Sequence, residues 1–432
     1  MWRRFATTAT LFTLLIGMQD LAAQTRPAVA SFPELTPLPL AEQLSTVREP
    51  LPVETLVDAG LQFSGASDDV AAADKEKLAG LLHKFRGEVA DVTSQADLAE
   101  RTLTFLHKNL FAIYSESQAR IDTVLESGVF NCVSSAVLYM VFARSVGLSV
   151  GGVRTADHAF CTVLVDGEPI DVETTNPFGY NPGQRKEFTD SFGKVTGFRY
   201  VSPANYTDRR AIGEKELLGL ILYDRVAGYT DGRYFRDAVA PAVSLYTLLA
   251  NEESRKMASA CIAVYIQSVA DRKDFTRAMQ FLDAVKASFG GSIDLEPLRQ
   301  DVYRGWVGNL IDSGRFADAE SLLSQAAVKA ALDDHDWMAL SVALVQQRAE
   351  GDARSSGFLA AAQTVADGMK KLGSQPELLQ NYEVYVHNAF VQLYNARKIA
   401  EARNVVDQGL EAYPDSRILE QDRQFLKQTP RQ

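Results

Sequence analysis

A short pattern recurs at nearly constant spacing through the second half of this 432-residue chain. A large apolar residue is followed three positions later by alanine, and four positions after that by alanine or an aliphatic residue. The copies begin at Phe235 and Ala238, Phe275 and Ala278, Phe316 and Ala319, Phe358 and Ala361, and Ile399 and Ala402. Spacings of three and four place these residues on one helix face. Steps of 40, 41, 42 and 41 residues predict five stacked helix pairs over residues 213–432, because a single pair cannot bury its apolar face alone. An irregular helical bundle is the alternative.

The recurring pattern resembles the second helix of tetratricopeptide repeats, and Pro414 follows the last copy as in that family. The resemblance covers about residues 215–425. It implies a paired-helix repeat superhelix whose concave surface binds a peptide or a partner protein, such as a protein of the cell envelope.

The N-terminus has the features of a secretory signal. Arg3 and Arg4 precede an uncharged, mainly apolar stretch from residue 5 to 18, and Leu21-Ala22-Ala23 ends in small residues suited to cleavage. The stretch is too short for a membrane span, and no later segment is long and apolar enough. We therefore predict a signal peptide over residues 1–23 and an exported protein, periplasmic or otherwise extracytoplasmic. An uncleaved N-terminal anchor is the alternative.

Composition excludes two classes of partner. Lys and Arg number 44 and Asp and Glu number 55, which gives a net charge of −11. The clustered Lys and Arg that phosphate contacts require are missing, so neither a nucleic acid nor an anionic membrane surface is expected. Three cysteines, Cys132, Cys161 and Cys261, are too few for a disulfide scaffold and leave at least one thiol free.

A proline-rich segment separates the predicted signal from the first domain. Six of the 15 prolines lie between residues 27 and 52, which disfavours a regular helix or a central strand. Residues 24–73 are therefore predicted to form a linker or a strap. Helical patterning begins near Asp74, and a second helix is expected from about Asp97, as its N-cap, to Phe111.

Cys132 stands where a buried helix is expected to begin. Asn131 is a good N-cap and Gly147 a good residue just past the C-terminus, so a helix is predicted over residues 132–146. The segment is apolar nearly all round, which predicts a central position. At the first turn the macrodipole and free N–H groups favour an anion, so they favour the thiolate of Cys132 and can hold an oxyanion. A small core residue is the alternative reading of this cysteine.

The residues after this helix predict a histidine base and a carboxylate. Strands are expected over residues 150–155, 158–165 and 168–174, with Asp166-Gly167 as a hairpin turn. The turn pairs Val165 with Glu168, Leu164 with Pro169, Thr162 with Asp171, and Phe160 with Glu173. Glu173 then lies diagonal to His158 on the same face, and Asp171 lies two residues farther away. Cys161 points to the opposite face, which makes it a core residue and disfavours a metal site with His158.

A thiol, an imidazole and a carboxylate in this arrangement follow the logic of a cysteine acyl-transfer triad. Glu173 is the better acid and Asp171 the alternative. Asn131, Gln118 and Tyr180 are candidates for the oxyanion or the cleft. The remaining histidines, His83, His107, His335 and His387, lie in helical segments without a partner at metal-ligand spacing, so surface or capping roles are predicted.

The same residues resemble bacterial transglutaminase-like proteins of the papain-like cysteine hydrolase superfamily. The resemblance rests on Asn131-Cys132, on Asp157-His158-Ala159-Phe160 and on Asp171-Val172-Glu173-Thr174-Thr175, and it covers about residues 97–210. Glu173 stands where the wider family usually has aspartate. The resemblance implies an α+β domain, over residues 74–212, with a central helix packed on an antiparallel sheet. It also implies thiol chemistry on amides without a metal or organic cofactor.

The sequence therefore predicts an exported cysteine amide hydrolase or peptidase that acts on protein or peptide substrates and carries helical repeats for binding. Two alternatives stay open: a catalytically inactive envelope scaffold that uses the repeats, and a glutamine–amine acyltransferase.

Overall fold

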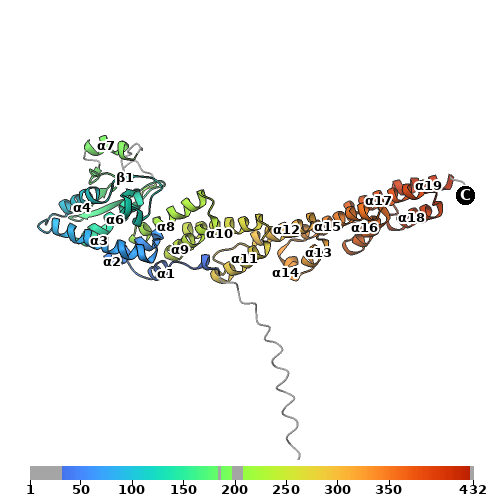
Figure 1. The fold of residues 1–432 in the computed structure, drawn as a ribbon, viewed down its shortest axis with the longest axis horizontal. Helices are drawn as coiled ribbons and strands as arrows, with labels where there is room; N and C mark the ends of the chain where they lie inside the picture. Colours follow the sequence, from blue (N-terminus) through green and yellow to red (C-terminus); the bar gives the residue numbers. More distant parts are fainter. Residues whose placement is uncertain (1–31, 183–185, 197–207, 429–432) are drawn as a thin grey trace, which may run out of the picture.

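The computed structural model describes residues 32–182, 186–196 and 208–428 (Figure 1). Within these ranges the chain is mostly helical and contains a small antiparallel sheet, in agreement with an α+β body followed by a helical array. The predicted signal peptide, residues 1–23, lies outside the described residues. None of the described helices combines the length and the apolar character that crossing a membrane requires.

The N-terminal body consists of helices packed around the sheet. Its helical elements are η1 (Pro33–Leu35), α1 (Pro39–Ser45), α2 (Val53–Ser64), α3 (Asp68–Glu88), α4 (Gln95–Asn109), α5 (Ile121–Ser127), α6 (Cys132–Ser145) and α7 (Lys186–Thr196). Its strands are β1 (Ile113–Tyr114), β2 (Val129–Phe130), β3 (Val150–Arg154), β4 (Ala159–Val165), β5 (Glu168–Val172) and β6 (Arg210–Ile212). The sheet has the order β5-β4-β3-β6 with antiparallel neighbours, and β1 and β2 form a separate parallel pair.

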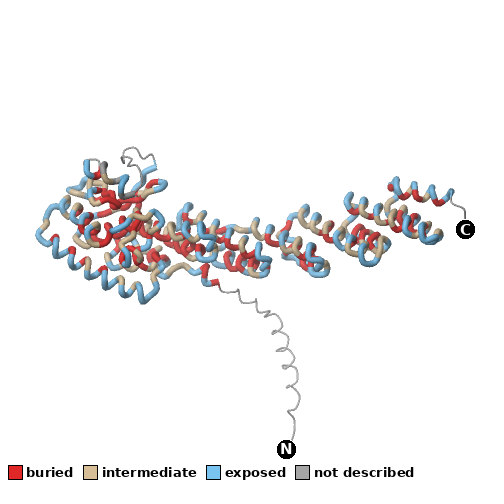
Figure 2. The backbone as a smooth tube through the Cα atoms, turned by 45° about the horizontal axis from the view of Figure 1, so that its top comes forward, coloured by how far each residue is buried: buried red, intermediate tan, exposed pale blue. Residues whose placement is uncertain are grey.

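Helix α6 lies at the centre of this body, as its apolar sequence predicts. Every residue from Val133 to Ala143 is buried. The helix packs against β3 and β4 and also against α2, α4 and α8. Buried residues accordingly concentrate in the N-terminal body and continue as a thinner line along the array (Figure 2).

The β4–β5 hairpin has the predicted register from its turn as far as Thr162, which pairs with Asp171. Asp166 and Gly167 both have positive φ, at 52° and 88°, as the tight turn requires. The expected pairing of Phe160 with Glu173 is wrong, because the ladder ends one step earlier, at Cys161 and Val172. Beyond that point the backbone N–H of Glu173 donates to the carbonyl of Gly179 (2.8 Å).

The proline-rich segment is not the irregular linker that its composition predicts. Its described part forms η1, α1 and α2, and α3 begins at Asp68 rather than near Asp74. Pro39 opens α1 and Pro52 is the N-cap of α2, positions at which the missing N–H of proline costs nothing. Helix α2 belongs to the core, with Leu61 and Phe63 fully buried.

The array contains the five predicted helix pairs. They are α8 (Glu214–Asp231) with α9 (Phe235–Leu249), α10 (Glu252–Asp271) with α11 (Phe275–Phe289), α12 (Glu296–Asp312) with α13 (Phe316–Leu323), α15 (Asp334–Ser355) with α16 (Phe358–Leu372), and α17 (Pro376–Asn395) with α18 (Ile399–Ala412). Each second helix begins with the large residue of the pattern. The third pair departs from the others, because α13 stops early and a short helix α14 (Ala326–Ala331) follows it. Helix α19 (Arg417–Gln428) ends the described array.

Small residues of the pattern let the paired helices approach closely. The five recurring alanines are at most 1% exposed. A Cβ atom on Gly368 would lie 2.6 Å from Cγ1 of Val345 in α15, and one on Gly409 would lie 2.7 Å from Cγ1 of Val386 in α17. The one-face interpretation of the repeat is therefore confirmed.

The predicted boundary at residue 213 marks the start of the array but not a gap in packing. Leu217, Leu218 and Ile221 of α8 are fully buried in the same core as α6. At the other side of the junction, the ring of Phe32 packs edge-on against Phe281 of α11, 4.8 Å between centroids. The start of the described N-terminal segment thus bridges the body and the array.

The buried alanine stripe gives a stability prediction. Ala361→Leu in α16 should destabilise the array by about 1–3 kcal/mol, because the close helix contact has no room for three more carbon atoms. The matched change Gln363→Leu, at an exposed position of the same helix, should stay within about 0.5 kcal/mol. Urea titration followed by far-UV circular dichroism measures both, and equal midpoints would contradict the packing described above.

Candidate active site

Cys132 is the first residue of α6, and its position is fixed by a complete capping box. The side-chain oxygen of Asn131 accepts from the backbone N–H of Ser134 (3.0 Å), and the hydroxyl of Ser134 accepts from the backbone N–H of Asn131 (2.9 Å). The thiol is half-buried. It therefore sits at the positive end of a central helix, where N–H groups lack intrahelical acceptors.

His158 stands just before β4 and faces both the thiol and a carboxylate. Its backbone carbonyl accepts from the N–H of Thr155 across the β3–β4 turn (2.9 Å), which fixes the chain at this point. Its Nε2 lies 2.6 Å from Oε2 of Glu173. Burial alone would lower the pKa of His158, but the charge of Glu173 and hydrogen bonds to Cys132 and Glu173 raise it well above its usual value.

Glu173 is an ionised, buried carboxylate with a full set of partners. It is 4% exposed, and Oε1 accepts from the hydroxyl of Thr175 (2.6 Å) and from its backbone N–H (3.2 Å). Burial would raise the pKa of Glu173, yet His158 and these two hydrogen bonds lower it. Because an ionised carboxylate only accepts, Nε2 of His158 must carry the proton. Nδ1 is then the basic nitrogen left for the thiol.

Asp171, the alternative acid, is engaged elsewhere. Its two oxygens each lie 2.6 Å from the guanidinium of Arg209, and Oδ1 also accepts from the hydroxyl of Thr162 (3.1 Å). The cross-strand contact with Thr162 follows from the predicted register. The structure therefore brings Glu173, and not Asp171, to the imidazole.

The candidate oxyanion residues have structural roles. Both amide hydrogens of Asn131 are used, since Nδ2 donates to the carbonyl of Glu116 (2.9 Å) and to Oδ2 of Asp224 in α8 (3.0 Å). Gln118 donates to the nearby carbonyl of Arg120 (3.1 Å). Tyr180 forms a β-bridge with Val172 and packs against the main core.

Two contacts that the sequence did not indicate hold Thr174, the residue after Glu173, in place. Thr174 is fully buried; its hydroxyl lies 2.8 Å from the hydroxyl of Ser135 in α6, and its carbonyl lies 3.0 Å from Nε2 of His107 in α4. The ring of His107 is edge-on to Phe111 and Phe130. Its predicted surface or capping role is therefore wrong. Only the tertiary fold brings residue 107 to residue 174, so the sequence carried no local signal for this contact.

Tyr114 is a second missed neighbour of the thiol. It pairs with Phe130 across β1 and β2, two residues before Cys132. Burial, followed by the nearby charges of Cys132 and Glu173, raises the pKa of Tyr114. Its hydroxyl is therefore protonated and able to donate beside the site.

The other thiols are remote from this chemistry. Cys161 is fully buried, as predicted, and its thiol donates to the carbonyl of Ala136 (3.3 Å). Burial raises the pKa of Cys161, and it raises that of Cys261 in α10 to about 11. Both residues are therefore poor nucleophiles.

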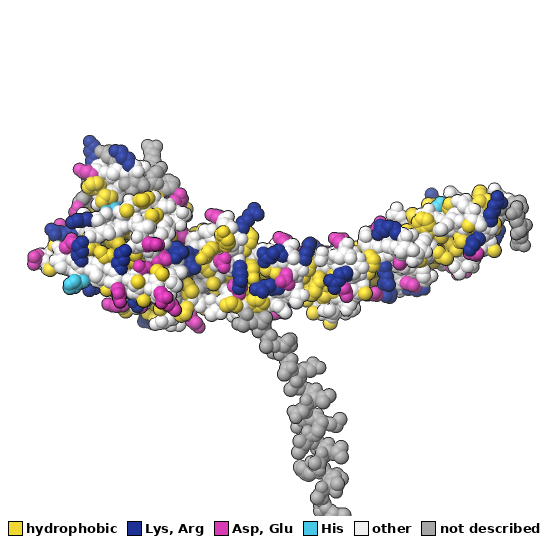
Figure 3. All heavy atoms as spheres, viewed as in Figure 1, with side chains coloured by type: hydrophobic (Ala, Val, Ile, Leu, Met, Phe, Trp, Pro, Cys, Tyr) yellow, Lys and Arg dark blue, Asp and Glu magenta, His cyan; other side chains and the backbone are white. Residues whose placement is uncertain are grey.

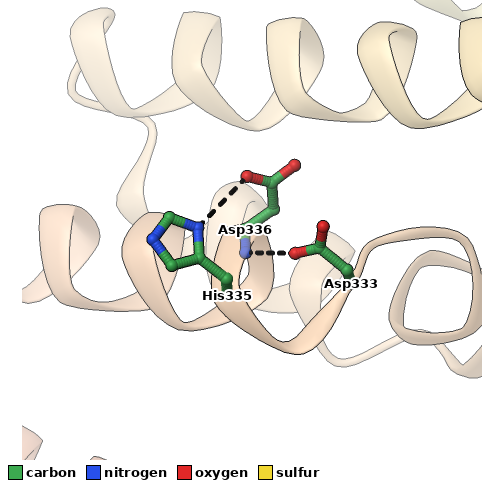
Figure 4. A group of neighbouring side chains, drawn as sticks. All are labelled: Asp333, His335 and Asp336. Carbon is green, nitrogen blue, oxygen red and sulfur yellow. Dashed lines mark hydrogen bonds and ion pairs between the residues drawn. The ribbon is translucent and has the colours of Figure 1, made fainter.

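One group of side chains in the described residues has the spacing of a metal site, and helix capping accounts for it (Figure 4). Asp333 is the N-cap of α15 and accepts from the backbone N–H of Asp336 (2.7 Å). His335 lies 3.7 Å from Asp336 and is 90% exposed. We assign this group no metal.

No family model, curated protein or solved structure matches the chain. The geometry of Cys132, His158 and Glu173 is therefore the basis on which a function can be proposed.

His107 gives a prediction with a defined pH window. Burial lowers its pKa to about 4, although the Thr174 carbonyl and the charge of Glu173 oppose this shift. Between pH 6.5 and 4 the unfolded chain binds a proton that the folded chain does not, so stability falls as the pH falls. From pH 7 to pH 5 the loss should be about 2 kcal/mol.

His107→Gln, which keeps a donor but does not titrate, should remove this contribution. Hydrogen exchange of the α6 amides at the two pH values, corrected for intrinsic rates, measures the opening of the N-terminal core. His83→Gln on the exposed side of α3 is the control and should behave as the wild type. The same pH-dependent loss in His107→Gln and in the wild type would refute the assignment.

Proposed function

We propose that this protein is an exported, transglutaminase-like cysteine amide hydrolase that acts on protein or peptide substrates. The observation that carries the proposal is the placement of three groups: Cys132 at the first turn of α6, where it raises the pKa of His158, and Nε2 of His158 at 2.6 Å from Oε2 of Glu173. The central helix on an antiparallel sheet supports a papain-like arrangement of the domain. Export rests on the sequence of residues 1–23.

The first half of the reaction forms an acyl-enzyme. His158 takes the proton of the Cys132 thiol, which its raised pKa favours. The sulfur then attacks the amide carbonyl, and a C–S bond forms while the carbonyl oxygen becomes an oxyanion. Free N–H groups in the first turn of α6 stabilise that charge. Collapse breaks the C–N bond, and His158 returns the proton to the leaving amine.

Water completes the cycle. His158 takes a proton from the water as its oxygen attacks the thioester, the C–S bond breaks, and the imidazolium reprotonates the sulfur. Glu173 holds the same imidazole tautomer through both halves and stabilises the imidazolium. None of these steps requires a metal or an organic cofactor.

The helical array is proposed to bind the substrate or an envelope partner. The early end of α13 leaves a cleft of about 680 Å³ beside α15 and α16. Trp337, Leu344 and Val345 line it, and Arg348 and Lys371 stand among its charged residues. On the face shown in Figure 3, both basic and acidic side chains are scattered over the array, and no continuous basic stripe is visible on that face, which fits a peptide or protein better than a nucleic acid.

A fluorescent peptidyl electrophile tests the catalytic assignment. Cys132→Ala should abolish labelling of the protein, and His158→Ala should slow it about 100-fold or more, because general base catalysis supplies about that much. Glu173→Gln should slow it less, because the imidazole remains but loses its fixed tautomer. Asp171→Asn, the matched change on the neighbouring position, should label like the wild type.

The products then separate the proposal from its alternatives. Release of new amino termini or ammonia from peptides supports the hydrolase. Incorporation of a labelled amine into a glutamine-containing protein, without hydrolysis, would instead indicate an acyltransferase. Labelling that persists in Cys132→Ala, or that does not change in His158→Ala, would instead support the alternative of a catalytically inactive scaffold.

A further inference from the structure

The cap that holds the nucleophile is itself held by the first helix of the array. Asn131 is 1% exposed, and its side-chain oxygen caps α6 through Ser134. Its amide nitrogen donates to Oδ2 of Asp224, in the middle of α8, at 3.0 Å. Asp224 thus binds the residue that precedes Cys132.

The base is tied to the array as well. Arg154, at the end of β3 and four residues before His158, binds Glu253 of α10 through both terminal nitrogens (3.1 and 2.7 Å). Its guanidinium also stacks over the ring of Tyr223 in α8, 5.1 Å from the centroid. Residues of the first two helix pairs therefore contact both chain segments that carry the reacting groups.

The surroundings of Asp224 disfavour the ionised form of its carboxyl group. Asp224 is half-buried, and burial raises its pKa to about 6, against the hydrogen bond from Asn131 and the charge of Arg154. The charge of Glu116 adds to the rise. Keeping a carboxylate here costs stability at neutral pH, whereas its contact with Asn131 orders the start of α6.

We infer that Asp224 is a positioning residue for Cys132, and that α8, the first helix of the array, is part of the catalytic unit. The inference rests on the proposed function. It adds that the chemistry depends on a hydrogen bond across the junction, so that the body cannot hold its nucleophile correctly without α8. The groups that act on the charge of Asp224 are Asn131, Glu116 and Arg154. The groups near the Cys132 thiol are His158, Glu173 and Tyr114.

Alkylation of Cys132 by iodoacetamide tests this inference in the full chain. The rate at Cys132 is followed by mass spectrometry at pH 6 and pH 9, and the absence of label on Cys161 and Cys261 checks that the protein stays folded during the reaction. At pH 6 a thiolate requires the imidazolium of His158, whereas at pH 9 an ordinary thiol ionises by itself. The ratio of the two rates therefore reports the contact between Cys132 and His158 rather than mere accessibility.

Asp224→Ala should lower the ratio of the pH 6 rate to the pH 9 rate about tenfold or more, because Asn131 loses its anchor and the thiol leaves the imidazole. Asp224→Asn keeps an oxygen that accepts from Asn131, and it should retain the wild-type ratio. Asp231→Ala, at an exposed position of the same helix, is the control. If Asp224→Ala does not fold, Asp224→Ser replaces it, because the serine hydroxyl is too short to reach Asn131.

Three outcomes overturn the inference. Equal ratios in the wild type and Asp224→Ala (or Asp224→Ser) would show that the contact does not position the thiol. Equal changes in the alanine (or serine) and asparagine variants would show that the charge matters and the hydrogen bond does not. A wild-type ratio that His158→Ala leaves unchanged would reject the proposed function itself, and the inference with it; only this last result touches both.

Discussion

The hydrogen bond between His158 and Glu173 is the contact on which the site depends. A buried carboxylate is costly unless it is paired, and removal of one partner of such a pair costs about 3–5 kcal/mol. Glu173 meets this requirement with His158 on one oxygen and Thr175 on the other. The hairpin register, the Ser135 contact and the His107 contact all fix the backbone of the residues that carry or follow this carboxylate.

Local rules were sufficient to find the three groups that we propose to react. An N-cap followed by an apolar run located Cys132, and strand alternation with an Asp-Gly turn favoured Glu173 over Asp171 as the partner of His158. Glu173 reaches His158 from just past the end of the ladder, and not from the predicted pairing with Phe160. The repeat was also readable, because alanine recurs wherever two helices must approach closely. These features depend on periods of 2 and 3.6 residues, which the sequence displays directly.

These local rules could not predict contacts between segments that are far apart in the sequence. His107 contacts Thr174 across 67 residues of sequence, and Asp224 contacts Asn131 across 93. No residue spacing in the sequence indicates either contact. The proline-rich segment was misjudged for another reason. Proline disfavours a helix interior but not a helix start, and α1 and α2 use it there. The residues that hold Cys132, His158 and Glu173 in place were therefore harder to predict than these three residues themselves.

Helix α8 belongs to both the N-terminal body and the array, and it therefore also affects the order in which parts of the molecule unfold. Stacked repeats exchange contacts only with their neighbours, so an array of this kind frays gradually from a free end. Among the described residues, the far end of the array, at α19, packs against α17 and α18, whereas the near end is anchored by leucines of α8, and of α9, that belong to the core around α6. We therefore expect loss of order that starts at α19 to stop at α9, and the outer repeats to open more often than the body.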